Sequence, residues 1–240
     1  MTSFFSALTY PFRGVAYVLR RPALWSYFAA AFAINLILFA VLAILFVHYR
    51  ADLVAWIMPA RFPDWLRATL GWILSGVVAV SGLFLFTIVG NILATPFLDA
   101  MTERILTDLG ETLPPGHGAG RALLRALVNQ TLKLFFFGGL QALLLLLLVT
   151  PAAVLHPPLS AFVAVLFLGF EYLDYPLDAR RVSVPDRFGW LLEHLGAALG
   201  FGSLLFLFLW IPLVGYLLLP LAVAGASLLA HDLDPARSRL

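Results

Sequence analysis

A charged stretch follows a long uncharged one in the second half of the chain. No Asp, Glu, Lys or Arg occurs from 134 to 170, and acids, tyrosines and arginines then crowd into 171–181. Glu171 and Asp174 are three residues apart, so on a helix they share a face. Ionisable groups at the edge of a membrane span either pair with one another or handle ions and protons. Two interpretations are therefore open, a structural polar clamp or a proton- or ion-linked site formed by Glu171, Asp174, Tyr175 and Asp178.

The surroundings of these acids can be predicted in part. Pro176 should end any helix near Tyr175, because the residue before a proline disfavours the helical conformation. The two tyrosines of the stretch are residue types that anchor helices at a membrane interface. The cations expected to pair with the acids are two pairs of neighbouring arginines, Arg180 with Arg181 and Arg20 with Arg21.

A second candidate site lies at the entry to the first long apolar segment. Arg20 and Arg21 precede Pro22, and positive charge beside the free N–H groups of a helix N-terminus can hold an anion. The alternative is that these arginines fix topology and anchor lipid headgroups. Asn35 lies within the apolar segment that follows, either as a helix-packing contact or as the lining of a pathway. The predicted substrate-binding residues are Arg20, Arg21 and Asn35.

A basic stripe precedes the uncharged run. Arg121, Arg125 and Lys133 are spaced by multiples of four residues, which puts them on one helical face. Such a face is typical of an interfacial helix that rests on anionic lipid. The pattern predicts a basic interfacial helix over 121–133.

The composition excludes a water-soluble protein. Hydrophobic residues make up 62% of the 240 residues, charged residues only 12%, and the mean hydropathy is +0.97. Soluble domains carry about 25% charged residues, so this chain must be an integral membrane protein. The net charge of only +2 does not indicate nucleic-acid binding. The absence of cysteine excludes disulfides and thiol catalysis.

Enzymatic motifs are absent from the sequence. There is no nucleophile elbow, no phosphate-binding glycine loop and no His-Glu-x-x-His. The five histidines are widely separated, with no pair at ligand spacing. We therefore expect no catalytic residue, no metal, no cofactor and no enzyme activity.

The hydropathy pattern predicts an all-α, polytopic fold in one helical membrane domain over 1–240. Two uncharged runs are long enough to cross a bilayer of about 30 Å at about 1.5 Å per residue. Two later runs are interrupted by prolines and predict helical hairpins, with limbs that look short. The expected elements are an interfacial segment 1–22, spans 23–49 and 68–98, an amphipathic extension 99–112, and hairpins 134–170 and 195–230.

Orientation follows from the distribution of Lys and Arg. If both hairpins return to their own side, 12 of the 15 Lys and Arg residues lie on one side of the membrane. The positive-inside rule then puts both termini in the cytoplasm. The near-exclusive use of Arg over Lys hints at a bacterial source, and hence at the bacterial inner membrane.

Three stretches carry a resemblance to a known family. They are "ATPFLDAMTERI" at 94–105, "EYLDYPLD" at 171–178 and "IPLVGYLLLPLAVAGAS" at 211–227. The chain resembles the CysZ-type sulfate transporters, which are grouped with the etoposide-induced membrane proteins. The resemblance implies two long transmembrane helices, two hairpins that enter the bilayer partly, homo-oligomers and sulfate uptake. It also adds Glu103 to the predicted boundary site.

The chain departs from this family where the family binds sulfate. The family's Pro-Gly-Leu/Ile-Arg reads Pro22-Ala23-Leu24-Trp25 here, so the glycine and the arginine are both missing. The histidine expected after the Asp-Tyr-Pro motif is Arg180, and the asparagine after Ile-Pro is Gly215. These changes leave the fold expectation intact and leave the substrate open.

Two functions follow as hypotheses. The first is membrane transport of a small solute, with sulfate or a related oxyanion as the candidate substrate. The second is a structural protein that organises lipids or partner proteins without transport. The partners expected in either case are the phospholipid bilayer and further copies of the chain.

Overall fold

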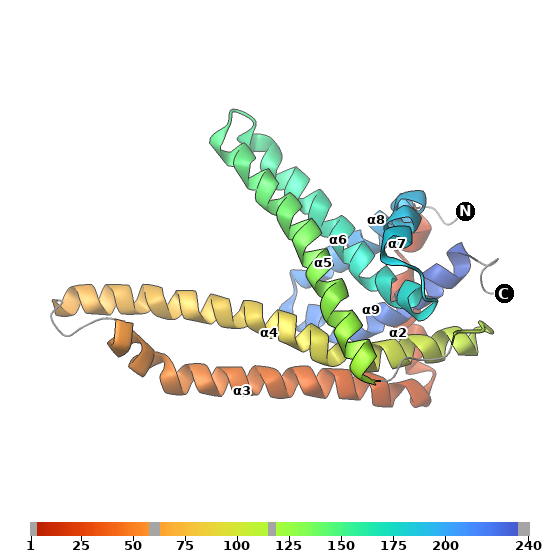
Figure 1. The fold of residues 1–240 in the computed structure, drawn as a ribbon, viewed down its shortest axis with the longest axis horizontal. Helices are drawn as coiled ribbons and strands as arrows, with labels where there is room; N and C mark the ends of the chain where they lie inside the picture. Colours follow the sequence, from red (N-terminus) through yellow and green to blue (C-terminus); the bar gives the residue numbers. More distant parts are fainter. Residues whose placement is uncertain (1–3, 58–62, 115–118, 235–240) are drawn as a thin grey trace. The chain divides into compact units, whose positions relative to one another are not determined.

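The computed structural model describes residues 4–57, 63–114 and 119–234. Every regular element among them is helical, which confirms the predicted all-α class (Figure 1). The helices are α1 (Phe4–Ala7), α2 (Tyr10–Leu19), α3 (Trp25–Ile57), α4 (Asp64–Asp108), α5 (Ala119–Leu145), α6 (His156–Ala179), α7 (Val184–Glu193), α8 (Leu195–Leu209) and α9 (Pro212–Leu233), with short 3-10 turns at Pro22–Leu24, Leu146–Val149 and Ala153–Leu155.

The chain forms two compact units. The smaller unit, Ala31–Ala94, contains most of α3 and the first two thirds of α4. Within it the two helices lie side by side (Figure 1) and come close at Asn35 and Gly90. The larger unit, Met1–Ala30 with Thr95–Leu240, holds the remaining helices and the end of α4.

Glycines let the helices of the larger unit approach backbone to backbone. At Gly202 of α8 a Cβ would lie 2.1 Å from the carbonyl oxygen of Val165 in α6, and at Gly169 of α6 it would lie 2.3 Å from that of Ala198. In a membrane the hydrophobic effect does not drive helices together, because lipid tails are as apolar as the side chains. Small residues then allow association by letting the backbones pack closely. The contact locks α6 against α8.

The N-terminal segment packs in the same way. At Gly14 of α2 a Cβ would lie 2.3 Å from the backbone nitrogen of Gly225 in α9. Val18 on the same face is also buried. Phe12 and Leu19 on the other face stay exposed, at 55% and 59%. The segment thus packs on α9 with one face, while Phe12, which touches the ring of Phe208, and Leu19 stay largely exposed.

The first hairpin breaks where the prolines predicted. α5 ends at Leu145, two 3-10 turns enclose Pro151, and α6 begins at His156 with prolines in its first turn, where their missing N–H groups have no intrahelical partner to lose. α5 and α6 then run side by side (Figure 1). The second limb was expected to be short, ending near Phe170. That expectation was wrong, because α6 has 24 residues and continues through the acidic stretch.

The continuation of α6 corrects the role assigned to Pro176. This proline lies inside α6, and the helix ends only at Ala179. Proline costs a helix one backbone hydrogen bond. Here the acids on either side of Pro176 take part in ion pairs, Asp174 with Lys133 and Arg187, and Asp178 with Arg187. These contacts fix the last turn despite the lost bond.

The predicted boundary between a basic interfacial helix and the first hairpin is absent. α5 runs without a break from Ala119 to Leu145, across the expected junction at 133–134. Lys133 does not face lipid, since its side chain is 9% exposed. The side chains of Arg121 and Arg125 lie outside the described residues, so their part of the stripe stays a prediction.

The second hairpin consists of α8 and α9, joined at Trp210 and Ile211. Pro212 begins α9, and Pro220 lies inside it. α8 has only 15 residues and meets the preceding α7 at a bend of 91°. The predicted combination of long helices and proline-broken hairpins is confirmed.

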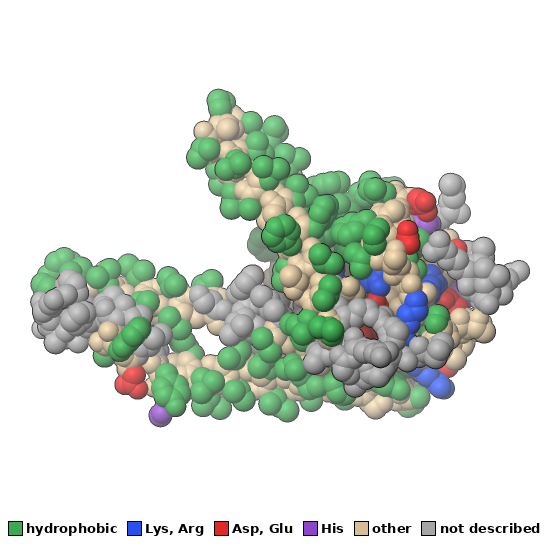
Figure 2. All heavy atoms as spheres, in the orientation of Figure 1, with side chains coloured by type: hydrophobic (Ala, Val, Ile, Leu, Met, Phe, Trp, Pro, Cys, Tyr) green, Lys and Arg blue, Asp and Glu red, His purple; other side chains and the backbone are tan. Residues whose placement is uncertain are grey.

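Several helices are long and apolar enough to cross a membrane. In the described part of the chain they are Pro22–Tyr49, Leu127–Val149 and Ala153–Ala179, and the bent pair α7 and α8 adds a fourth if it is one span. Figure 2 shows hydrophobic side chains over the far half of the α5–α6 hairpin, while the charged side chains of this unit gather near α7. The span predicted over 68–98 stays a prediction beyond its apolar Ala68–Val80 portion.

Candidate functional site

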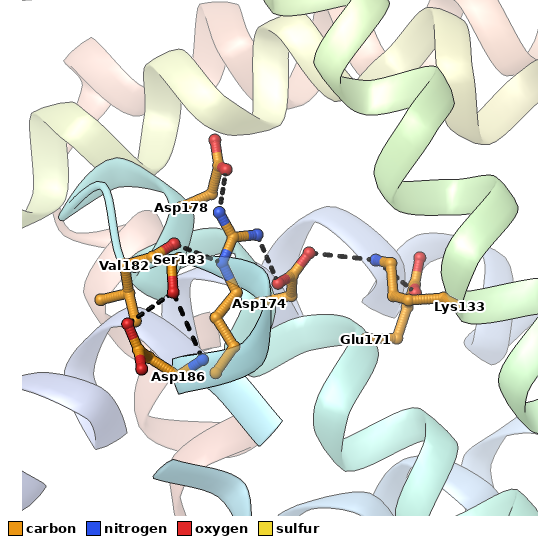
Figure 3. A network of polar contacts seen from close by, with 8 residues as sticks. Lys133, Glu171, Asp174, Asp178, Val182, Ser183 and Asp186 are labelled. Carbon is orange, nitrogen blue, oxygen red and sulfur yellow. Dashed lines mark hydrogen bonds and ion pairs between the residues drawn. The ribbon is translucent and has the colours of Figure 1, made fainter. Parts of the chain in front are cut away.

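A buried charge network lies where α5, α6 and α7 meet (Figure 3). The ammonium Nζ of Lys133 lies 2.7 Å from Glu171 Oε2 and 3.2 Å from Asp174 Oδ2. The side chains of these three residues are all close to nine-tenths buried. A buried charge without a partner is strongly unfavourable, so the two acids and the lysine must be held together.

Arg187 of α7 extends the network. Its guanidinium donates to Asp174 Oδ1 at 2.7 Å and also to Asp178, while its Nε donates to the carbonyl of Val182 at 2.9 Å (Figure 3). Asp174 therefore bridges two cations, one from α5 and one from α7. The network ties the first hairpin to the helix that leads into the second.

The local sequence explains why α7 presents Arg187 in this place. Ser183 is extended and caps α7, its Oγ accepting from the backbone N–H of Asp186, and Pro185 occupies the first turn. Serine followed three residues later by an acid is a known helix-start signal. Because α7 starts there, Arg187 falls one turn into the helix and faces α6. This spacing could have identified Arg187, which the sequence analysis missed.

The structure corrects the predicted cation partners of the acids. The partners of Glu171 and Asp174 are Lys133 and Arg187, not the arginine pairs at 20–21 and 180–181. Sequence spacing suggested the wrong cations because the contacts join helices that are distant in the chain.

Arg180 belongs to a second buried cluster. It donates to both carboxylate oxygens of Glu111, at 2.7 and 3.0 Å, and to the carbonyl of Ala230 at 3.3 Å. His231 of α9 also contacts Glu111 at 2.7 Å. Burial alone would raise the pKa of Glu111, but the hydrogen bonds and charges of Arg180 and His231 outweigh burial and lower it. This cluster ties the end of α6 to α9 and to the connection after α4.

Two further acids lie on the last turns of α4. Asp99, the first residue beyond the predicted span 68–98, was not among the predicted site residues, and Glu103 lies one turn later. Desolvation by burial, and then the charges of Asp178, Glu103 and Asp174, raise the pKa of Asp99 to about 7 despite the opposing charge of Lys133. A carboxyl with this pKa is divided between its protonated and its charged form near neutral pH. The predicted members Glu103 and Tyr175 are half-buried.

The two entry arginines, Arg20 and Arg21, lie in different surroundings. Arg21 Nη1 lies 2.9 Å from Asp108 Oδ2, contacts the Tyr17 hydroxyl, and its guanidinium stacks 4.0 Å over the Tyr17 ring. Arg104 also reaches Asp108, at 3.3 Å. Arg20 is exposed. One carboxylate thus faces two guanidiniums close to the start of α3, and positive charge is left in excess.

Asn35 belongs to the smaller unit. Its Nδ2 donates to the carbonyl of Ala31 at 3.0 Å, and a Cβ on Gly90 would lie 2.3 Å from its Oδ1. The amide therefore sits in a close contact between α3 and α4, which supports the packing alternative. Among the described residues, no group of three or more His, Asp or Glu side chains could hold a metal ion.

Comparisons with known proteins identify the family. The model of the family described as Sulfate transporter CysZ/Etoposide-induced protein 2.4 matches residues 10–220. The chain belongs to this family.

Relatives in this family carry the name Sulfate transporter CysZ. One from Pseudomonas fluorescens is 34% identical over 215 residues, which cover 86% of each chain. One from Pseudomonas paraeruginosa is 30% identical over 219 residues, covering 88% of this chain and 89% of the relative. One from Vibrio cholerae is 30% identical over 192 residues, covering 76% of each. Membership of the CysZ family and the apolar helices together make this chain a multi-pass membrane protein.

The match to the CysZ family contains most of the site. Lys133, the three network acids, Arg187 and the entry arginines all lie within 10–220. His231 of the second cluster and Asp232, which accepts from the Tyr10 hydroxyl at 2.6 Å, lie beyond it. The sequence analysis missed four features of the site, which come from four different elements or connections. They are Arg187, Asp99, Glu111 and the role of Lys133 as a partner of the acids. No single stretch could have brought them together.

Proposed function

We propose that this protein transports sulfate or a related oxyanion across the bacterial inner membrane. The observation that carries the proposal is the similarity to sulfate transporters, which extends from α2 to the middle of α9 and so includes the elements of the charge network and the entry arginines. A chain of apolar helices with no recognisable catalytic set is consistent with transport rather than with an enzyme.

The entry arginines are the residues proposed to receive the anion. Arg20 is exposed, and Arg21 is held at the start of α3 by Tyr17 and Asp108. Guanidinium groups donate in a fork that suits tetrahedral oxyanions, and the free N–H groups of a helix start add to the field. They would replace part of the hydration shell that the anion loses on entry. Because the family's glycine and arginine are Ala23 and Trp25 here, the substrate range need not be sulfate alone.

The buried network is proposed to have a different role. The positive charges of Lys133 and Arg187 are already balanced by three acids. A substrate anion would therefore be repelled from this network. The network's proposed role is to hold α5, α6 and α7 in one arrangement. We propose Asp99, whose pKa is raised to about 7 by burial and by nearby acids, as the group that would take up a proton there.

The setting of the transporter is part of the same proposal. Both termini lie in the cytoplasm by the distribution of Lys and Arg, and the chain assembles as a homo-oligomer, as the resemblance implies. The competing proposal is a membrane-organising protein without transport. The observations that favour it are the loss of the family's glycine and arginine at the entry and the partial neutralisation of Arg21.

Uptake into proteoliposomes tests the two proposals. We expect labelled sulfate, or one of sulfite, selenate and phosphate, to enter vesicles with the protein faster than empty vesicles. Arg20→Ala/Arg21→Ala should lower oxyanion binding in calorimetry and lower uptake together. Arg13→Ala, which removes an exposed arginine of α2 elsewhere, is the matched control. Uptake no faster than in empty vesicles for all four anions would reject transport and favour the organising role.

A further inference from the structure

Arg21, one of the two entry arginines, shares a carboxylate with a third arginine, Arg104. Arg21 Nη1 lies 2.9 Å from Asp108 Oδ2, and Arg104 Nε lies 3.3 Å from Asp108 Oδ1. The two guanidiniums come from different segments, the turn before α3 and the last turns of α4. They converge on the two oxygens of Asp108, so an anion held between them lies beside this carboxylate.

Most hydrogen-bond donors of these two guanidiniums are unused. A guanidinium has five N–H donors. Among the described residues, Arg21 contacts its polar partners only through Nη1, and Arg104 only through Nε. The side chains of Arg21 and Arg104 are 40% and 55% exposed, so a ligand from solution can reach the remaining N–H groups. Two positive charges face one negative charge, which leaves the cluster able to attract an anion.

Tyr17 of α2 holds Arg21 in position and adds a further donor. The Arg21 guanidinium lies 4.0 Å over the Tyr17 ring, and the Tyr17 hydroxyl accepts a hydrogen bond from Arg21. Because the hydroxyl oxygen accepts, its own hydrogen is left to donate. Burial raises the pKa of Tyr17. The charges of Arg21, Asp108 and Arg104 also act on this pKa, so the four side chains form one cluster.

The carboxylate of Asp108 divides tetrahedral oxyanions into two classes. Its oxygens offer about four acceptor positions. The two arginines occupy two of them, and the side chain is 24% exposed. An unprotonated ligand oxygen beside this carboxylate is repelled, whereas a ligand O–H can donate to it. Sulfate and selenate have no O–H near neutral pH, but hydrogenphosphate and hydrogenarsenate do.

The proton is the one feature by which this cluster can separate such anions. Hydrogenphosphate and sulfate are both tetrahedral dianions, so the arginines attract them about equally. A site built to hydrogen-bond a ligand hydroxyl discriminates against the analogue that lacks the hydroxyl, because the group in the site is then left unpaired. Asp108 is such a group.

We propose that the cluster of Tyr17, Arg21, Arg104 and Asp108 binds tetrahedral oxyanions that carry a proton, such as hydrogenphosphate, more tightly than sulfate. The inference rests on the proposed transport function and narrows its substrate class. The arginines and the tyrosine donate to the unprotonated oxygens, and Asp108 accepts from the ligand O–H. Sulfate still binds, with lower affinity, because the arginines outnumber the carboxylate.

Calorimetry on the purified full-length protein tests this preference. At about pH 8, above the second pKa of phosphate groups, phosphate is mainly the dianion that keeps one proton. It then matches sulfate in charge and shape, and arsenate and selenate form a second matched pair. We expect phosphate to bind about tenfold more tightly than sulfate, and arsenate than selenate, as one charge-assisted hydrogen bond predicts.

Asp108→Asn tests the role of the carboxylate. The ratio of phosphate to sulfate affinity should fall from about tenfold to about twofold or less, because the charged acceptor is lost. Removal of a negative charge without that hydrogen bond would strengthen both dianions alike and leave the ratio unchanged. Both affinities are measured on the same variant, so the ratio does not depend on the fraction that is folded. Asp232→Asn is the matched control, since Asp232 contacts Tyr10 and Arg13 at the other end of α2.

Arg104→Gln tests whether the third arginine takes part. It should weaken phosphate and sulfate binding each by about two- to fivefold, because the guanidinium is partly exposed, and should keep the preference for phosphate. Arg13→Gln, at the other end of α2, should change neither affinity.

The outcomes separate this inference from the proposed function. Binding of sulfate as tight as that of phosphate, a ratio unchanged in Asp108→Asn, or unchanged affinities in Arg104→Gln would overturn the inference. If proteoliposomes also take up sulfate in preference to phosphate, transport stands and only the substrate class is wrong. If no oxyanion enters the vesicles, transport itself fails, and the affinity ratio still decides what the cluster binds.

Discussion

Lys133 of α5 and Glu171 of α6 form an ion pair of 2.7 Å, with side chains that are 9% and 12% exposed. The two residues are 38 positions apart in the sequence and belong to opposite limbs of the first hairpin. Asp174 pairs with the same ammonium and also with the guanidinium of Arg187 of α7. A single lysine thus joins the hairpin to the rest of the larger unit.

Removal of this lysine should be strongly destabilising. Lys133→Met leaves Glu171 without its ion-pair partner and Asp174 with only one, and breaking a buried pair costs about 3–5 kcal/mol. Thermal unfolding in detergent should show a large fall in melting temperature. The control is Arg13→Gln, which removes the exposed pair with Asp232 and should cost less than about 1 kcal/mol. Equal melting temperatures of the two variants would mean that the network does not hold the hairpin.

The glycine contact between α6 and α8 gives a second prediction. Gly202→Ala puts a Cβ 2.1 Å from the Val165 carbonyl and 2.8 Å from the Gly169 nitrogen, so two backbones must separate. Overpacking of this kind costs about 1–3 kcal/mol or more. Gly196→Ala on the same helix meets no atom within 4 Å and should be neutral, or stabilising by up to about 1 kcal/mol. Melting temperatures of the two variants would test this, and a stable Gly202→Ala would contradict the observed helix contact.

The elements could be predicted from sequence better than the contacts could. Uncharged runs and prolines such as Pro151 and Pro212 act locally, through hydropathy and the backbone, so the spans and hairpin breaks were visible. Pro176 led to the wrong prediction of a helix end near Tyr175. The ion pairs around it join different helices, and a local sequence pattern does not predict such contacts. Lys133 looked like part of a lipid-facing stripe for the same reason. Which face of α5 is buried depends on where α6 lies, and the glycine contacts of α6 with α8 help to fix that position.

Acid should weaken the cluster at Glu111. The folded pKa of this carboxyl is lowered, so its contribution to stability is present above the unfolded pKa of about 4.3 and is lost as the pH falls through the folded value. Glu111→Gln should therefore melt below the wild type at pH 7, and the difference should shrink below about pH 4.5. Asp52→Asn, at an exposed position of α3, should show no such convergence. A difference that stays constant from pH 7 to pH 3 would mean that the carboxylate charge is not what stabilises the cluster.

Anion binding at the entry arginines should respond to Asp108. This carboxylate neutralises part of the positive charge of Arg21 and Arg104, so Asp108→Asn leaves more net positive charge beside the start of α3. Because the groups are partly exposed, we expect only about a two- to fivefold gain in sulfate affinity by calorimetry at low salt. The gain should fall as the ionic strength rises, since these charges are screened over about 10 Å at 0.1 M. A loss of affinity would instead mean that Asp108 positions the Arg21 guanidinium for the anion and that its geometry matters more than its charge.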